Sequence, residues 1–411
     1  MISEEQIELL VERLINRIQE ANTYFLMEMG SSIKKIRNLT PTEAQQLVQI
    51  LKYGGNYEDI VEELAKYTNL NIKDIEDIFK EVSKKDLNFA KNFYQYRKIP
   101  FVEYAENEAL KRQTQALANI VKNEMYNFTR ANVLGYTIRD LKGRPQFIGL
   151  RETYNRVLDE ALVNVGTGKE TFDSAMSRIM KDIGGSGLKT IEYESGRSMR
   201  LDSAVRMHLK GRLRELHNEN QKIIGEEIEA DGIEISVHGN PAPDHEEVQG
   251  RQFSNEEYEK LNSGVSAKDY KGKIYTLDHD GKNGYRPISE LNCYHYIYSI
   301  VLGVSKPRYT DEQLKEIIDN TNEKVEFEGK KYNKYECTQL QRNLEREVRK
   351  QKDIQIFAKA SGNDELVSEA QQKITQLTQK YKELSDISEL PTKMQRMKVP
   401  QYKRVAKSKL K

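Results

Sequence analysis

The 411-residue sequence has no tryptophan, only two cysteines and no long apolar run. Cys293 and Cys337 are too few for a disulfide framework, and they suit a reducing compartment as free thiols or as a metal ligand. A run of about 18 apolar residues, which a membrane-spanning helix needs, is missing. The first residues are amphipathic and acidic, whereas a secretory signal is basic and then apolar. We therefore expect that the protein is made and used in the cytoplasm, or leaves it by a route other than secretion, and that it has no membrane partner.

Several enzyme motifs are missing as well. The sequence contains no GxSxG elbow, no HExxH zinc motif, no dinucleotide fingerprint and no Walker lysine. Glycine-rich segment 184–187 lacks the Lys and the Ser or Thr that complete a phosphate-binding loop, and we interpret it as a hinge between helices. Basic residues number 65 and acidic residues 64, so the net charge attracts neither nucleic acid nor an anionic membrane. The sequence predicts that the protein is not an enzyme.

Helical periodicity dominates the first 230 residues. One apolar stripe follows the N-terminal segment and is formed by Ile7, Leu10, Val11, Leu14 and Ile18. Because the rest of this helix is charged, the stripe should pack against a core. Thr40, followed by Pro41 and Glu43, predicts the start of a helix that ends at Gly54.

Other boundaries in this region are also predicted from local signals. Asn71 and Asp86 are interpreted as helix caps. Residues 101–134 are predicted to form one long helix after Pro100, and residues 193–232 another with a basic, solvated face. Aromatic residues between 89 and 128 are better explained by packing than by a stacking platform for single-stranded nucleic acid.

Segment 232–310 differs from the rest of the chain. It holds four of the six histidines and one of the two cysteines, together with many Gly, Pro and Asn residues. Ile233, Ile235 and Val237 alternate with polar residues, which predicts a half-buried strand, and residues 271–277 repeat the pattern. A small α+β domain is therefore expected here.

Polar side chains of this segment allow a metal-binding interpretation. Imidazole nitrogen and thiolate sulfur suit a structural zinc ion, which takes four such ligands. The candidate ligands are His238, His245, Cys293 and His295. Their spacing does not match a standard zinc finger. The alternative is that no cofactor binds, that the histidines hydrogen-bond loop carbonyls, and that Cys293 is buried as a small apolar residue.

A second chemical interpretation is catalytic. LDHDGKNG followed by ELNCYH resembles the order of residues in HNH endonucleases. His279 would be the general base, Asn292 a positioning residue and His295 a metal ligand. The segment after His295 is β-branched and aromatic where that motif begins a helix. The corresponding alternative function is a metal-dependent nuclease.

The C-terminal part predicts helices and a basic tail. Thr310 caps one helix, and residues 324–332 form a hairpin that turns at Glu328 and Gly329. Two further helices, separated by Gly362 and Asn363, are predicted to pack as an antiparallel hairpin. Residues 391–411 contain eight Lys or Arg and no acid. Such a tail is expected to be disordered and solvated.

Three sequence blocks, in order, resemble the phage minor capsid protein 2 family of tailed phages and prophages of Gram-positive bacteria. The matching positions are His238, Gly239, Pro243, His245, Gln249 and Gly250; then Asn292, Cys293 and His295; then Gln339, Gln341, Arg342, Glu345 and Arg346. Val248 stands where this family usually has Trp, and Leu291 where it has Gly. The resemblance covers residues 125–385.

The resemblance implies a minor head protein in the capsid interior or at the portal vertex. Its expected partners are portal and major capsid or scaffold proteins, with several copies in each virion and packaged DNA against the tail. The predicted fold is α+β and predominantly helical. Its predicted parts are a helical region (1–230), a small α+β domain with the Cys and His residues (231–308), a helical C-terminal region (309–390) and a basic tail (391–411).

Overall fold

The computed structural model describes residues 4–68, 72–140, 142–167, 172–191, 196–277, 287–289, 293 and 295–405. Helices predominate and the sheets are small and antiparallel, which confirms the predicted α+β, mostly helical class. The chain forms two compact units, each assembled from three separate stretches of sequence. Unit 1 comprises Met1–Val11, Asn71–Lys122 and Met207–Gln339, and unit 2 comprises Glu12–Leu70, Asn123–Arg206 and Leu340–Lys411.

The N-terminal part consists of helices. They are α1 (Glu4–Ile36), α2 (Pro41–Tyr53), α3 (Asn56–Thr68), α4 (Ile72–Arg97) and α5 (Glu108–Thr129). The predicted start of α2 is confirmed, because Thr40 and Glu43 form a reciprocal capping box. Gly54 ends this helix as predicted.

Two predicted boundaries in this region are wrong. Asp86 is not a cap, since it lies buried in the middle of α4. Residues 101–134 are not one helix, because α5 begins only at Glu108 and ends at Thr129. The cause is Asn107, whose side-chain oxygen accepts a hydrogen bond from the N–H of Leu110 at 3.0 Å. The other predicted cap, Asn71, lies outside the described residues.

Unit 2 contains a sheet that the helical periodicity did not reveal. Its strands are β1 (Leu134–Arg139), β2 (Pro145–Gly149), β3 (Lys189–Ile191) and β4 (Ser198–Arg200), in the order β2-β1-β3-β4. The connecting helices α6 (Leu150–Thr167) and α7 (Phe172–Ser186) follow β2. A short 3-10 helix, η1 (Ala131–Val133), precedes β1. Residues 184–186 therefore form the end of α7, and the chain continues into β3, so the hinge between helices was a wrong interpretation.

A second, three-stranded sheet lies in unit 1 and has the order β6-β5-β9. The elements of this region are α8 (Leu201–Glu227), β5 (Gly232–Ile235), β6 (Gln252–Ser254), α9 (Asn255–Asn262), β7 (Ala267–Lys268), β8 (Ile274–Tyr275) and β9 (Ile297–Ile300). The predicted strand at 233–237 is confirmed as β5, although it ends at Ile235. A compact apolar core contains Val248 and Cys293 together with Phe253 of β6, and it also includes Ile235 of β5 and Ile297 of β9.

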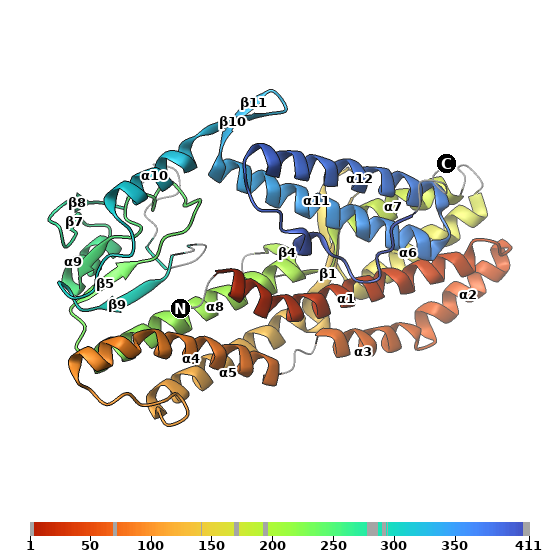
Figure 1. The fold of residues 1–411 in the computed structure, drawn as a ribbon. Helices are drawn as coiled ribbons and strands as arrows, with labels where there is room; N and C mark the ends of the chain where they lie inside the picture. The colour runs from red at the N-terminus through yellow and green to blue at the C-terminus, as the bar shows by residue number, and fades with distance from the viewer. Residues whose placement is uncertain are drawn as a thin grey trace. The chain divides into compact units, whose positions relative to one another are not determined.

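The C-terminal elements follow the predicted order. They are α10 (Asp311–Asn322), β10 (Lys324–Phe327), β11 (Lys330–Asn333), α11 (Lys334–Ser361), α12 (Asp364–Ile387) and the 3-10 helix η2 (Met394–Met397). Figure 1 shows α11 and α12 side by side. Gln341 donates to Ser385 at 2.8 Å, and Gln355 donates to Gln371 at 3.1 Å. Because these contacts run in opposite directions along the two helices, the predicted antiparallel hairpin is confirmed.

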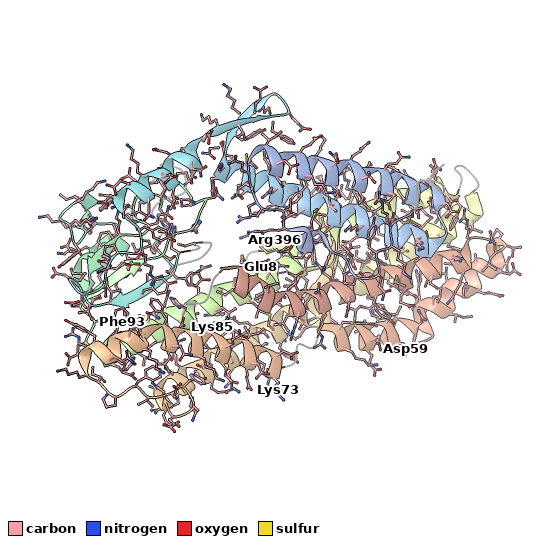
Figure 2. The ribbon with its side chains drawn as sticks, viewed as in Figure 1. Glu8, Asp59, Lys73, Lys85, Phe93 and Arg396 are labelled. Atoms are coloured by element: carbon pink, nitrogen blue, oxygen red, sulfur yellow. The ribbon has the colours of Figure 1, made fainter. Side chains whose placement is uncertain are left out.

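The basic tail is not a free, solvated segment as far as residue 405. The hydroxyl of Tyr381 accepts a hydrogen bond from the N–H of Lys393 at 2.8 Å, and Arg349 donates to the carbonyl of Arg396 at 2.7 Å. Met397 is only 2% exposed. Figure 2 labels Arg396, whose guanidinium lies 4.0 Å from the carboxylate of Glu345. Burial of Met397 and the buried carboxylate of Glu345 therefore hold this segment on the helical hairpin in spite of its charge.

Candidate metal centre

The backbone register of unit 1 positions the histidine-bearing segments. Ile235 at the end of β5 pairs with Ile297 at the start of β9. The pairing continues beyond the strands, since the N–H of Ser236 donates to the carbonyl of Tyr296 at 2.8 Å and its hydroxyl accepts from the N–H of Tyr296 at 2.8 Å. His295 is thereby fixed beside the segment that leaves β5.

The loop between β5 and β6 returns to the strand from which it departs. The N–H of Gly250 donates to the carbonyl of Ile235 at 2.9 Å, and the N–H of Ile235 donates to Arg251 at 3.0 Å. Gly250 has φ +70°, and a Cβ there would lie 2.5 Å from Leu314. Glycine is therefore needed at this closure. The closed loop carries His245 into the interior.

Three of the predicted ligands meet in this interior. The Sγ atom of Cys293 lies 3.4 Å from Nδ1 of His245 and 3.5 Å from Nδ1 of His295. The candidate ligand atoms of these residues all lie within 4.8 Å of one another, and the three side chains are buried. The structure thus brings together two imidazoles and one thiol from segments that are 48 residues apart.

In His245 and His295, the ring nitrogen on the side away from Cys293 is Nε2, and in each case it faces an oxygen atom. Nε2 of His295 lies 3.4 Å from Oε1 of Gln249, and Nε2 of His245 lies 3.7 Å from Oδ2 of Asp244. The N–H of His238 donates to the same Oε1 of Gln249 at 3.2 Å. Since a backbone N–H is always a donor, this contact identifies the atom as oxygen and fixes the orientation of the amide. The Nδ1 atoms of both rings therefore face Cys293.

The surroundings of Cys293 make its thiol easier to deprotonate. Burial raises the pKa of this thiol, but hydrogen bonds with His245 and with the backbone N–H of His295 lower it by more, so the pKa lies below its ordinary value. Thiolate is the form of cysteine that binds metal ions.

His238 differs from the other predicted ligands. Its ring lies against that of His295, with the centroids 4.5 Å apart and the planes tilted by 44°, but His238 is partly exposed and is not a member of the clustered group. His279 and Asn292, the other residues of the nuclease hypothesis, lie outside the described residues. That hypothesis stays a prediction. Metal ligation also stays a prediction at this point.

The sequence predicted no role in metal binding for Gln249 or Asp244, although the structure places both beside the histidines. Gln249 is a matching position of the first sequence block, and Asp244 directly precedes His245. Their role at the site depends on which ring nitrogen of His295 and His245 they face. Only the folded loop determines that.

Comparison with known proteins decides the family. A family model described as phage minor capsid protein 2 matches residues 2–386. The chain belongs to this family. It is therefore a phage minor capsid protein and a component of the virion. No curated protein and no solved structure matches the chain. Within the described residues, no helix is long and apolar enough to cross a membrane.

The three sequence blocks of this minor capsid protein contribute to two parts of the structure, the His and Cys cluster and the contact between α11 and α12. The first and second blocks supply the His and Cys cluster with Gln249 and Gly250. The third block lies on α11, where Gln341 and Glu345 are buried and contact Ser385 and Tyr381 of α12. Val248, which replaces the usual Trp, packs in the apolar core. This departure therefore leaves the clustered ligands unchanged.

Proposed function

We propose that this minor capsid protein has a structural role in the phage head and binds portal, major capsid or scaffold subunits. The family match over residues 2–386 carries the proposal. Exposed apolar side chains on unit 2 support it. Tyr53 at the end of α2 is 79% exposed, and Ile50 on the same helix and Val163 on α6 are also exposed. Tyrosine and isoleucine at such positions are suited to a protein interface.

Incorporation into heads tests this role. Phage heads assembled with the Ile50→Glu/Tyr53→Glu variant should contain less of the protein than heads with the wild-type chain. Tyr270→Glu, which changes an exposed tyrosine in unit 1, is the matched control and should be incorporated normally. Normal incorporation of a folded Ile50→Glu/Tyr53→Glu variant would refute this surface as the interface.

Imaging of heads with and without the protein tests the proposed location. Density that is lost at the portal vertex would support binding to portal, and density that is lost along the inner wall would support binding to capsid or scaffold. Identical images of the two kinds of head would contradict the structural role.

Packaged DNA is a second proposed partner. Lys398, Lys403 and Arg404 are exposed on the C-terminal segment that packs on the helical hairpin. A cationic surface gains affinity for DNA by releasing counterions from the phosphates. Holding three cations on a folded segment reduces the ordering cost that a free tail would incur on binding.

Charge reversal tests the DNA contact. The triple variant Lys398→Glu/Lys403→Glu/Arg404→Glu should bind a short duplex more weakly, with a salt dependence shallower by about three counterions at most. The control reverses three exposed lysines elsewhere, in Lys324→Glu/Lys330→Glu/Lys331→Glu. Equal binding by the two triple variants would contradict a specific role of the C-terminal segment.

We propose a structural rather than a catalytic role, and nuclease activity is the opposing outcome. Purified protein incubated with plasmid DNA and Mg²⁺, Mn²⁺ or Zn²⁺ should leave the plasmid intact. Cleavage that requires the divalent ion and is lost in His279→Ala would establish the nuclease instead.

A further inference from the structure

We propose that His245, Cys293 and His295 hold a structural zinc ion that ties the loop after β5 to the segment before β9. This inference concerns the stability of unit 1 and does not depend on the proposed partners. It rests on the separation of the ligand atoms, on the groups behind each ligand and on the chemistry of the donor set.

The two separations between sulfur and nitrogen fit tetrahedral zinc. With a Zn–S bond of about 2.3 Å and a Zn–N bond of about 2.0 Å, a tetrahedral ion holds sulfur and nitrogen about 3.5 Å apart. The observed distances from Sγ of Cys293 are 3.4 Å to Nδ1 of His245 and 3.5 Å to Nδ1 of His295. In both rings the nitrogen that faces the sulfur is Nδ1.

Groups behind the ligands complete the pattern of a metal site. A histidine that binds metal through one nitrogen usually donates its other N–H to a carbonyl or carboxylate, which fixes the tautomer. Oε1 of Gln249 occupies that position for His295, and the carboxylate of Asp244 lies near Nε2 of His245. Gln249 is buried, and its Nε2 has no partner among the described residues. We explain this buried amide by a role in orienting His295, for which Gln249 needs only its oxygen.

The donor set selects the class of ion. Two imidazoles and a thiolate are borderline to soft ligands and favour Zn²⁺ over Mg²⁺ or Ca²⁺, which prefer oxygen. The three ligands are buried, so the ion would be shielded from competing water. The described residues provide three ligands, which leaves one position of the tetrahedron to another donor.

A metal cross-link would stabilise a region that has little regular secondary structure. The sheet β6-β5-β9 has strands of only three or four residues. The loop from Ser236 to Gly250 contains no regular helix or strand. Binding energy at a structural site adds directly to folding energy, because the unfolded chain does not hold the ligands together. A zinc ion would therefore stabilise the loop and the strand ends at once.

The alternative is a hydrogen-bonded cluster without metal. A neutral thiol of Cys293 can donate to only one of the two Nδ1 atoms, so the other ring would have to donate to the sulfur. Both arrangements would give similar atomic positions. They differ in metal content, in the accessibility of the thiol and in the response to chelators.

Elemental analysis of the full chain, purified without chelators, tests the inference. The wild-type protein should contain about one equivalent of zinc, and Cys293→Ala should contain less than about a tenth of an equivalent. Cys337→Ala is the matched control, since Cys337 is the other buried cysteine and lies on α11, outside the cluster. It should keep its zinc. A wild-type protein without zinc, or equal zinc in the two variants, would overturn the proposal.

A measurement on the wild-type protein covers the case in which Cys293→Ala does not fold. Replacement of the native ion by Co²⁺ should produce a thiolate-to-cobalt charge-transfer absorption and the visible bands of a tetrahedral ion. A strong chelator should abolish these bands and lower the thermal stability of unit 1. Absence of the charge-transfer band in folded, cobalt-treated protein would exclude Cys293 as a ligand. Head incorporation is a separate readout, so failure of this inference would not affect the proposed function.

Discussion

Nδ1 of His217 lies 2.8 Å from Oδ1 of Asp86, and both side chains are only 1% exposed. The other ring nitrogen, Nε2, lies 2.8 Å from the carbonyl oxygen of Ile297. Each ring nitrogen of His217 thus faces one oxygen acceptor. Asn220 supports the carboxylate by donating to its second oxygen at 3.0 Å. This network connects α4, α8 and β9 inside unit 1.

Removal of this contact should be costly. His217→Ala leaves a buried carboxylate without one of its main partners, and we expect a loss of about 3–5 kcal/mol in the free energy of unfolding. Denaturant titration of the variant measures the loss. His208→Ala on the same helix, where the side chain is partly exposed, should cost much less. Equal, small losses for the two variants would contradict a structural role for the pair.

A buried charge cluster in unit 2 predicts a pH dependence. Arg200 donates to Asp353 at 3.0 Å and lies 3.3 Å from Asp202. Burial raises the pKa of Asp353 to about 6 from its ordinary value of 3.8, although Arg200 opposes the shift. Because the folded pKa is the higher one, the stabilisation by this proton is complete below about pH 4. It is lost as the pH rises to about 6.

Asp353→Asn should remove this dependence. Between pH 4 and pH 7 the stability of the variant should therefore rise relative to wild type, by about 3 kcal/mol at most. Chemical denaturation across that pH range measures the difference. Asp319→Asn, a change at an exposed aspartate, should follow the wild-type curve. A constant difference between Asp353→Asn and wild type would show that Asp353 does not titrate in this range.

Gly250 should be the critical glycine of the loop that carries His245. Gly250→Ala combines a φ of +70° with a Cβ placed 2.5 Å from Leu314, so we expect a destabilisation of about 1–3 kcal/mol. Gly239→Ala is the control, since a Cβ there meets nothing within 4 Å. Thermal unfolding of both variants checks the prediction, which fails if they behave alike.

Gln249 should tune the proposed zinc site without being a ligand. Gln249→Leu removes the oxygen that faces Nε2 of His295, and we expect zinc affinity to fall about 10-fold to 100-fold. Gln249→Glu keeps an acceptor oxygen and should retain more affinity. Competition with a chromogenic chelator measures both. Identical affinities for Gln249→Leu and wild type would remove Gln249 from this role.

Met397 should anchor the C-terminal segment. It packs against Val348, Ile374 and Tyr381 on the helical hairpin, so Met397→Ser should cost about 2–4 kcal/mol of packing energy and release the segment. Limited trypsin digestion should then cleave at Lys393 and Lys398 faster. The control is Met394→Ser, at a position that is 42% exposed. Unchanged protection in Met397→Ser would contradict the anchoring role.

Local signals predicted the parts of the fold that depend on neighbouring residues. Thr310 forms the capping box of α10, and the turn at Glu328 and Gly329 joins β10 to β11. Both devices involve residues within a few positions of one another. The same holds for the start of α2 at Thr40. Interactions between such close neighbours can be predicted from sequence patterns.

Predictions failed where a residue depends on a partner far along the chain. Asp86 resembles a cap, but its partner His217 is 131 residues away. Strand β1 exists because it pairs with β2 and β3, the second of which is more than 50 residues away. The tail resembles a free segment because its own sequence contains only the basic charges. Its partners Glu345 and Tyr381 are buried residues elsewhere in the chain.

For the candidate site, the sequence by itself determined the donor types and the family blocks in which they lie. The tertiary structure decided which donors meet. The β5 and β9 register and the closure at Gly250 gather His245, Cys293 and His295, and leave His238 outside the cluster with its ring tilted against that of His295. It also assigned Gln249 and Asp244 to the outer edges of the rings. The reason is physical, because metal-ligand geometry depends on distances across the fold, and spacing along the chain does not specify them.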